Sequence, residues 1–117
     1  MIHYDPENIF AKILRSEIPC KKVYEDDYAL AFADIFPKAP LHILVIPKGA
    51  YTCFSDFSQR ASDPEIVGFF KAVECVTQQT GAHKDGYRLI SNKGANAHQE
   101  VPHFHVHVLG GKSLGGF

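Results

Sequence analysis

The chain has 117 residues, a length that corresponds to one domain with a substantial buried core. Hydrophobic residues make up 45% of it and charged residues 21%, a balance that excludes a disordered chain and a membrane-spanning one. Its 12 basic and 13 acidic residues give a formal net charge of −1, which argues against broad binding to nucleic acid or to a membrane surface but allows a small anionic ligand in a local pocket.

The first part of the chain predicts one short helix followed by three strands. Asp5 and Pro6 are typical of a helix N-cap and first turn, and the apolar residues that follow fall on one helical face before Pro19. Residues 21–26, 28–34 and 41–47 are expected to be strands, because they are rich in β-branched and aromatic residues and end at turn residues or proline. In the second strand large residues alternate with alanine, so one face is nearly bare and lets a helix or a ligand approach closely.

The strongest helix signal covers the middle of the chain. Ser62 and Glu65 have capping-box spacing, Pro64 lies in the expected first turn, and Gly81 is expected to cap the C-terminal end. The preceding stretch "YTCFSDFSQRASD", residues 51–63, is interpreted as a variable connection.

Two further strands complete the predicted fold. One covers residues 86–92, a glycine-bearing loop follows over residues 93–100, and the last strand begins at Pro102 and ends at Gly110. The order α-β-β-β-α-β-β with short connections predicts an α+β fold, a five-stranded antiparallel sheet with one long and one short helix.

The last strand carries three histidines at every second position, in "VPHFHVHVLGG". Successive side chains on a strand point to opposite faces, so His103, His105 and His107 are expected to share one face, roughly 6–7 Å apart. The apolar residues expected on the other face are Phe104, Val106 and Val108. That apolar face needs a core, and the histidine face is therefore expected to line a polar cleft.

Three interpretations of this row are open. Three imidazoles can bind zinc, but the ends of a straight row are too far apart to share one ion, so a further ligand would have to come from elsewhere, such as His42 or His98. The row could also be an exposed face without chemistry. The third interpretation is catalysis, because neutral imidazole is a good nucleophile, neighbouring imidazoles discourage one another from charging, and a glycine-bearing loop can offer backbone N–H groups to an anion. We favour catalysis and expect neither a metal nor a cofactor.

The stretch "HFHVHVL" fits the histidine triad pattern, in which three histidines alternate with apolar residues, at every position. The chain also resembles the nucleotide-binding branch of histidine triad hydrolases in "IFAKILRSEIP", "LAFADIFPKAPLHILVIPK", "GYRLISNKG" and "HVHVLGGK". In the nucleotidyl-transferase branch the third histidine is a glutamine. The resemblance implies hydrolysis of nucleoside 5′-phosphoramidates or related adenylyl esters, a purine nucleotide (AMP-like) ligand, no nucleic acid or membrane partner, and a homodimer.

The resemblance also implies roles for individual residues. His105 would attack the α-phosphorus and form a covalent nucleotidyl-histidine, which water then hydrolyses. His103 would fix the tautomer and orientation of His105, while His107 and His42 would bind the phosphate and assist the leaving group. Asp34 would accept hydrogen bonds from the ribose hydroxyls. The residues implied for the base pocket are Ile9, Phe10, Ile13, Phe32 and Ile35, and those implied for the phosphate side are Asn92, Gln99 and Glu100.

Several features leave room for other functions. Asp34 could equally start a turn, and the apolar pocket residues could be ordinary core. Asn8 and Ala11 stand where some relatives have a zinc-binding C-x-x-C pair, and Glu100 stands where many eukaryotic relatives have serine, so its role near phosphate is open. The alternatives are a non-catalytic purine nucleotide-binding regulator and a metal-dependent hydrolase that uses the histidines as ligands.

Cysteine usage and the N-terminus indicate the cytoplasm. Cys20, Cys53 and Cys75 are odd in number and scattered without a C-x-x-C pair, which suits a reducing compartment. The first ten residues do not combine a basic region with an apolar run, so no signal peptide is expected.

Overall fold

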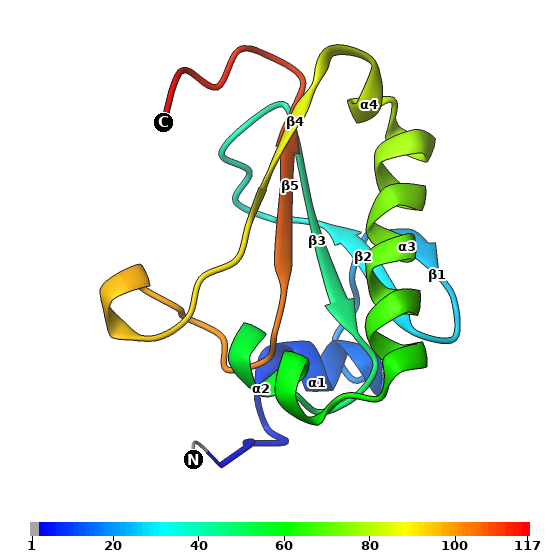
Figure 1. Cartoon of the computed structure of the whole chain (residues 1–117), viewed down its shortest axis with the longest axis vertical. Helices are drawn as coiled ribbons and strands as arrows, with labels where there is room; N and C mark the ends of the chain where they lie inside the picture. The colour runs from blue at the N-terminus through cyan, green and yellow to red at the C-terminus, as the bar shows by residue number, and fades with distance from the viewer. Residues whose placement is uncertain (1–2) are drawn as a thin grey trace.

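The computed structural model describes residues 3–117, which are organised around a five-stranded antiparallel sheet (Figure 1). The strands are β1 (Lys22–Glu25), β2 (Ala29–Ala33), β3 (Leu41–Pro47), β4 (Tyr87–Ile90) and β5 (Val106–Gly110). They lie side by side in the order β1-β2-β3-β5-β4, and each neighbouring pair is antiparallel. The predicted fold class is confirmed.

The long helix has the predicted ends. The helices are α1 (Ile9–Leu14), α2 (Phe54–Arg60), α3 (Asp63–Thr80) and α4 (Ala82–Asp85), with a short 3₁₀ turn η1 (Ala95–Ala97). At the start of α3, Ser62 and Glu65 form a reciprocal capping box, in which each side chain bonds the backbone N–H of the other. At its end, Gly81 has a left-handed backbone with φ +82°, which glycine adopts without a steric penalty.

The predicted start of the first helix was wrong. The helix begins at Ile9, and its N-cap is Asn8, whose Oδ1 accepts the backbone N–H of Ala11 at 2.9 Å. Asp5 instead opens a turn, because its carbonyl accepts the Asn8 N–H at 3.2 Å and its Oδ1 accepts the Glu7 N–H at 2.9 Å. Asp and Asn both cap helices and both start turns, so the sequence did not distinguish the two positions.

The connection predicted over residues 51–63 contains the helix α2. Its N-cap residue, Cys53, makes no side-chain capping bond, so the usual start signal is missing. The helix is retained by packing, because Phe57 is only 1% exposed and stacks on Phe104 with 4.9 Å between ring centroids.

The last strand begins at Val106 rather than at Pro102. Val106 is paired with Val45 on β3, and the same register would set Phe104 against Pro47. Pro47 has no N–H to donate, and its carbonyl is taken by the ring of His103 at 2.9 Å. The Phe104 N–H donates to the Tyr51 carbonyl at 2.7 Å instead, so the ladder stops before it reaches the first two histidines of the motif.

Helices pack against both faces of the sheet. On one face α3 packs over a cluster that includes Ala29 and Ala31 of β2, and α1 lies against part of the other face, where Phe10 packs on Leu30 and Phe32 (Figure 1). The small side of β2 therefore admits a helix, as its alternation predicted. Phe104, Val106 and Val108 all belong to the α3-side cluster. The three histidines lie on the α1 side, which confirms the predicted separation of the two sets. Within residues 3–117, no helix combines the length and the apolar character that crossing a membrane requires.

Candidate functional site

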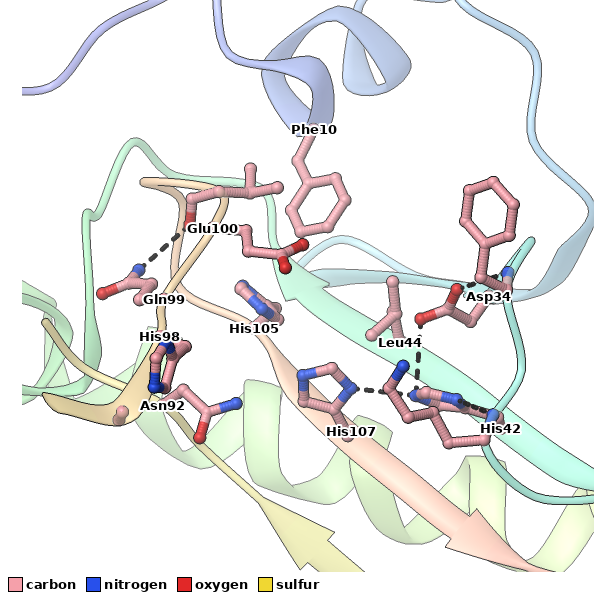
Figure 2. Close-up of a pocket in the computed structure, with 14 residues that line it drawn as sticks. Phe10, Asp34, His42, Leu44, Asn92, His98, Gln99, Glu100, His105 and His107 are labelled. Atoms are coloured by element: carbon pink, nitrogen blue, oxygen red, sulfur yellow. Dashed lines mark hydrogen bonds and ion pairs between the residues drawn. The ribbon is translucent and has the colours of Figure 1, made fainter. Parts of the chain in front are cut away.

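A cavity of about 510 Å³ opens on the α1 side of the sheet (Figure 2). Its lining comes from α1, the turn between β2 and β3, both of the strands β3 and β5, and the loop before β5. The predicted catalytic residues that line it are His42, His105 and His107. The predicted binding residues that line it are Phe10, Asp34, Asn92, Gln99 and Glu100.

The remaining predicted residues do not line this cavity. His103 is 0% exposed and lies behind His105, and Phe32 is buried beneath Phe10 with 5.6 Å between ring centroids. Ile13 borders a separate cavity of about 330 Å³ at the C-terminal end of α1, and Ile9 and Ile35 are exposed. The prediction from family resemblance missed Phe36, Leu44 and Val101 as apolar lining residues. Leu44 could have been found from strand alternation, because it shares a face with His42 on β3.

The hydrogen bond at the ring of His105 determines which nitrogen is free. Its Nδ1 lies 2.7 Å from the backbone carbonyl of His103. A carbonyl only accepts, so Nδ1 carries the proton in the neutral ring and Nε2 keeps its lone pair. The ring also packs edge-on against Phe10, with 5.1 Å between centroids. His105 is thus held as a neutral imidazole with a nucleophilic nitrogen at the cavity.

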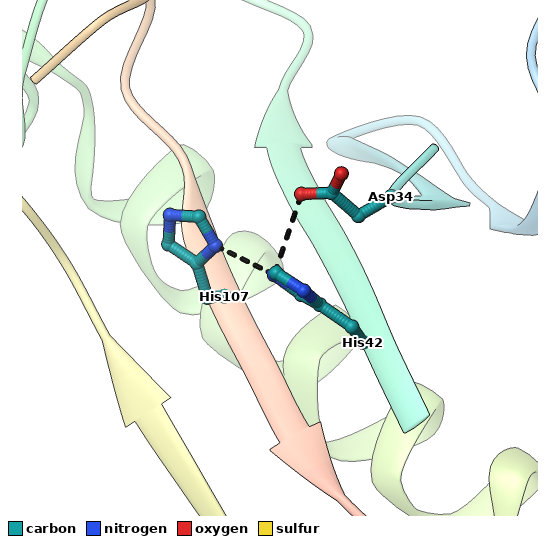
Figure 3. Close-up of side chains that lie close together, drawn as sticks. All are labelled: Asp34, His42 and His107. Atoms are coloured by element: carbon teal, nitrogen blue, oxygen red, sulfur yellow. Dashed lines mark hydrogen bonds and ion pairs between the residues drawn. The ribbon is translucent and has the colours of Figure 1, made fainter. Parts of the chain in front are cut away.

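His42 and His107 form a second hydrogen-bonded pair (Figure 3). His107 is paired with Leu44 in the sheet. His42 precedes Leu44 by two residues on the same face of β3, so it is the diagonal neighbour of His107. The backbone N–H of Lys38 donates to His42 Nδ1 at 3.0 Å, so the proton of neutral His42 is on Nε2. That Nε2 lies 2.9 Å from His107 Nδ1, which must accept, and neutral His107 therefore carries its own proton on Nε2.

The charge state of these rings follows from their burial. Burial lowers the pKa of His105 and of His42 below the ordinary value, although Asp34 opposes this effect at both. Burial, together with the neighbouring rings of His105 and His42, lowers the pKa of His107 to about 4. At neutral pH the site therefore offers an unprotonated nucleophile on His105 and an N–H donor on His107, both without a net charge.

Asp34 belongs to the turn and to the cavity at once. Its Oδ1 accepts the Phe36 N–H at 2.8 Å, which is the turn contact considered from the sequence, and its Oδ2 lies 3.4 Å from His42 Nε2. The cavity surface of this carboxylate leaves acceptor capacity for a ligand, so the two interpretations of Asp34 do not exclude each other.

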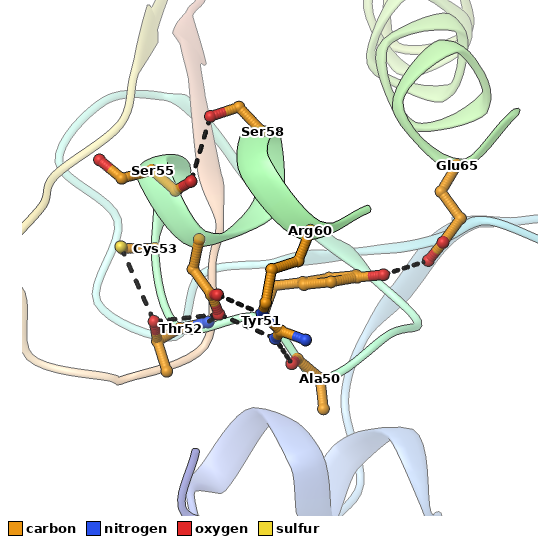
Figure 4. Close-up of polar contacts among 9 residues, drawn as sticks. Ala50, Tyr51, Thr52, Cys53, Ser55, Ser58, Arg60 and Glu65 are labelled. Carbon is orange, nitrogen blue, oxygen red and sulfur yellow. Dashed lines mark hydrogen bonds and ion pairs between the residues drawn. The ribbon is translucent and has the colours of Figure 1, made fainter. Parts of the chain in front are cut away.

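The side-chain amide of Gln99 shapes the loop that borders the cavity. Its Nε2 donates to the carbonyls of Thr52 at 2.7 Å and Val101 at 3.0 Å, and its Oε1 accepts the Gly94 N–H at 3.2 Å. Thr52 is in turn held through its N–H by Asp56, at 2.8 Å, within the network of polar contacts around α2 (Figure 4). The contribution of Gln99 in this arrangement is to fix the loop over residues 94–101.

Asp34, His42 and His107 also present atoms within 4.8 Å of one another, close enough to consider a metal ion. A neutral histidine that binds a metal through Nε2 carries its proton on Nδ1, and it normally donates that proton to a hydrogen-bond acceptor. His42 would therefore need an acceptor beside Nδ1. Here a donor, the Lys38 N–H, faces that nitrogen. The donor set therefore does not fit a resident metal in this arrangement.

Burial of His103 predicts a loss of stability in acid. Burial lowers the pKa of His103 to about 4 in the folded chain, against 6.5 in the unfolded chain. The unfolded state therefore binds more protons between these values, so the contribution is complete above pH 6.5 and is lost as the pH falls towards 4. Between pH 7 and pH 4 the free energy of unfolding is expected to fall by about 3 kcal/mol less in His103→Gln than in the native protein. Urea unfolding of both proteins at the two pH values measures the difference. Equal pH dependence in both proteins would contradict the expectation.

Known proteins resemble the chain over nearly its whole length. The profile of the HIT domain family matches residues 15–114. A HIT-like protein of Azospirillum brasilense is 61% identical over 112 residues, which cover 96% of this chain and 92% of that protein. The purine nucleoside phosphoramidase of Escherichia coli K12 is 46% identical over 110 residues, which cover 93% of this chain and 91% of the enzyme. The solved structure of a histidine triad protein from Clostridium difficile has a TM-score of 0.87 at 38% identity, and the match covers 100% of this chain and 99% of that one.

Proposed function

The chain belongs to the HIT domain family, and we propose that it hydrolyses purine nucleoside 5′-phosphoramidates or related adenylyl esters. The reaction is proposed to pass through a covalent nucleotidyl-histidine on His105. The observation that carries the proposal is the hydrogen bond from His105 Nδ1 to the His103 carbonyl, which leaves Nε2 unprotonated at the cavity. The similar enzyme of Escherichia coli, named a purine nucleoside phosphoramidase, supports the substrate class.

The proposed reaction has two steps. In the first, His105 Nε2 attacks the α-phosphorus, the bond from phosphorus to the leaving nitrogen breaks, and that nitrogen takes up a proton from solvent and leaves as an amine. The positive charge that develops on the His105 ring is shared with the His103 carbonyl through Nδ1–H. In the second step water attacks the phosphorus and the bond to Nε2 breaks. The attacking water releases a proton to solvent, which balances the proton taken up by the leaving amine in the first step. His107 Nε2–H donates to a phosphoryl oxygen in both steps.

Mass spectrometry of the intact protein tests the proposal. The protein is mixed briefly with adenosine 5′-phosphoramidate and quenched at mildly alkaline pH, and free AMP is measured in parallel. A mass gain of one adenylyl group together with AMP release is expected, in excess chelator as well as without it. Turnover that is lost in chelator and restored by zinc would favour the metal-dependent hydrolase. AMP binding with neither adduct nor product would favour the non-catalytic regulator.

Asp34 is proposed to hold the ribose. In Asp34→Asn the Oδ1 acceptor of the turn remains, but the carboxylate that would accept the ribose hydroxyls is lost, so we expect the AMP dissociation constant to rise about tenfold. Isothermal titration calorimetry measures this, with Asp27→Asn as a control because Asp27 is an exposed carboxylate away from the cavity. The native protein should show the same weakening with 2′-deoxy-AMP. Unchanged affinity in both experiments would leave Asp34 as a turn residue alone.

The chain is also proposed to form a homodimer. β4 is an edge strand, and Leu89 on it is 44% exposed and paired with Val108, so it lies on the same side of the sheet as α3. On α3, Val67 and Phe70 are 53% and 41% exposed. An apolar edge strand and an apolar helix face on the same side of the sheet suit a second copy across a two-fold axis. The molar mass in solution, in the native protein and in Leu89→Lys, tests this assembly.

We propose a cytoplasmic location and activity without a cofactor or a nucleic-acid partner. The three cysteines are free, which supports a reducing compartment. The net charge of −1 argues against broad binding to nucleic acid.

A further inference from the structure

We infer that Tyr4, which lies outside the histidine motif, is a positioning residue for the nucleophile: its hydroxyl holds the ring of His103, and His103 holds His105. The inference rests on the proposed function, because it concerns the rate at which His105 is nucleotidylated. Tyr4 lies in the segment before α1, outside the histidine motif, and it does not line the cavity.

The direction of the Tyr4 hydrogen bond follows from the other bond of the same ring. His103 Nε2 lies 2.9 Å from the Pro47 carbonyl, which only accepts, so Nε2 carries the proton. Nδ1 of the neutral ring is then an acceptor, and the Tyr4 hydroxyl, 2.7 Å away, donates to it. The two rings meet edge-on with 5.6 Å between centroids. Burial keeps the pKa of His103 low, at about 4, so the ring stays in this neutral form at physiological pH.

His103 makes contacts through both its ring and its backbone carbonyl. The ring of His103 is bonded by Tyr4 and Pro47, and its backbone carbonyl accepts the proton of His105 Nδ1 at 2.7 Å. Residues 101–105 precede β5, so no ladder of strand hydrogen bonds holds the His103 carbonyl in place. One backbone bond, from the Phe104 N–H to the Tyr51 carbonyl at 2.7 Å, holds the peptide unit that contains this carbonyl, and the two side-chain bonds of His103 anchor the same residue further.

The Tyr4 hydroxyl is the bonding partner of a buried ring nitrogen. His103 is 0% exposed, and across residues 3–117 no buried side-chain nitrogen or oxygen is left without a partner. Removing the hydroxyl would leave Nδ1 buried and unbonded, a state that favours a shift of the ring. Such a shift would move the carbonyl that orients His105, while the cavity lining that would contact base and ribose would remain.

The variant Tyr4→Phe tests this inference because it keeps the ring and removes only the hydroxyl. The control is Tyr28→Phe, whose ring is 39% exposed and packs near Gly68, away from the cavity. In Tyr4→Phe we expect the single-turnover rate of His105 adenylylation to fall roughly three- to tenfold, the effect of one lost hydrogen bond between neutral groups, with the Kd for AMP changed less than about twofold. The ¹⁵N resonance of His103 Nδ1 should shift in Tyr4→Phe alone.

Three outcomes would overturn the inference. An unchanged adenylylation rate with a shifted His103 resonance would make the bond purely structural. Equal losses of rate and AMP affinity would indicate general disruption rather than positioning. If the native protein forms neither adduct nor AMP, the proposed function fails and the inference falls with it, and the native-protein control separates this result from the other two.

Discussion

Replacing His105 by alanine is expected to lower turnover by about three orders of magnitude or more, while the AMP dissociation constant stays within about threefold. The variant removes the only atom proposed to form a bond to phosphorus. Phe10, Phe36 and Asp34 line the cavity from other elements, where they could contact base and ribose, and are left in place. Steady-state AMP release and calorimetric titration with AMP measure the two quantities.

A matched control and a rescue make this experiment specific. His83→Ala removes a histidine whose ring bonds the Thr77 carbonyl at 3.1 Å, far in sequence from the motif and outside the cavity, and it should leave turnover unchanged. Because His105→Ala leaves a space of imidazole size, added imidazole is expected to restore part of the activity. Near-normal turnover in His105→Ala would show that the nucleophile is another group.

The variant Phe104→Ala is expected to lower the free energy of unfolding by about 3–5 kcal/mol, a large fraction of the 5–15 kcal/mol typical of a domain. Phe104 stands between two motif histidines, yet its ring is 1% exposed and packs on Phe57 and Phe69 at centroid distances of 4.9 and 5.2 Å. Its removal leaves a cavity between the sheet, α2 and α3. Urea unfolding followed by circular dichroism measures the loss.

Phe36→Ala is the matched control for this prediction. Phe36 is 76% exposed and lines the cavity, so its loss should leave the free energy of unfolding within about 0.5 kcal/mol and weaken AMP binding instead. A destabilisation of less than about 1 kcal/mol in Phe104→Ala would contradict the core position of that ring.

Much of the fold was predictable because its signals are local. The capping box of Ser62 and Glu65 and the left-handed Gly81 involve residues within one turn of a helix, so their spacing in the sequence already specifies their contacts. Strand alternation likewise predicted that Phe104, Val106 and Val108 would face a core and that the histidines would lie on the opposite side. The helix α2 escaped prediction because its N-cap residue, Cys53, makes no side-chain capping bond and its stability comes from the packing of Phe57.

The antiparallel sheet, the long helix, and the identity and common side of the three histidines could all be predicted from the sequence. The proton positions on His103 and His107 could not be predicted, because the partners that decide them are distant in the chain, whereas His105 and His42 have their deciding partners two and four residues away. Tyr4 and His103 are 99 residues apart, His42 and His107 are 65 apart, and Pro47 and His103 are 56 apart. An imidazole has the same intrinsic preference at each position, so its tautomer follows from the donor or acceptor that folding brings to it.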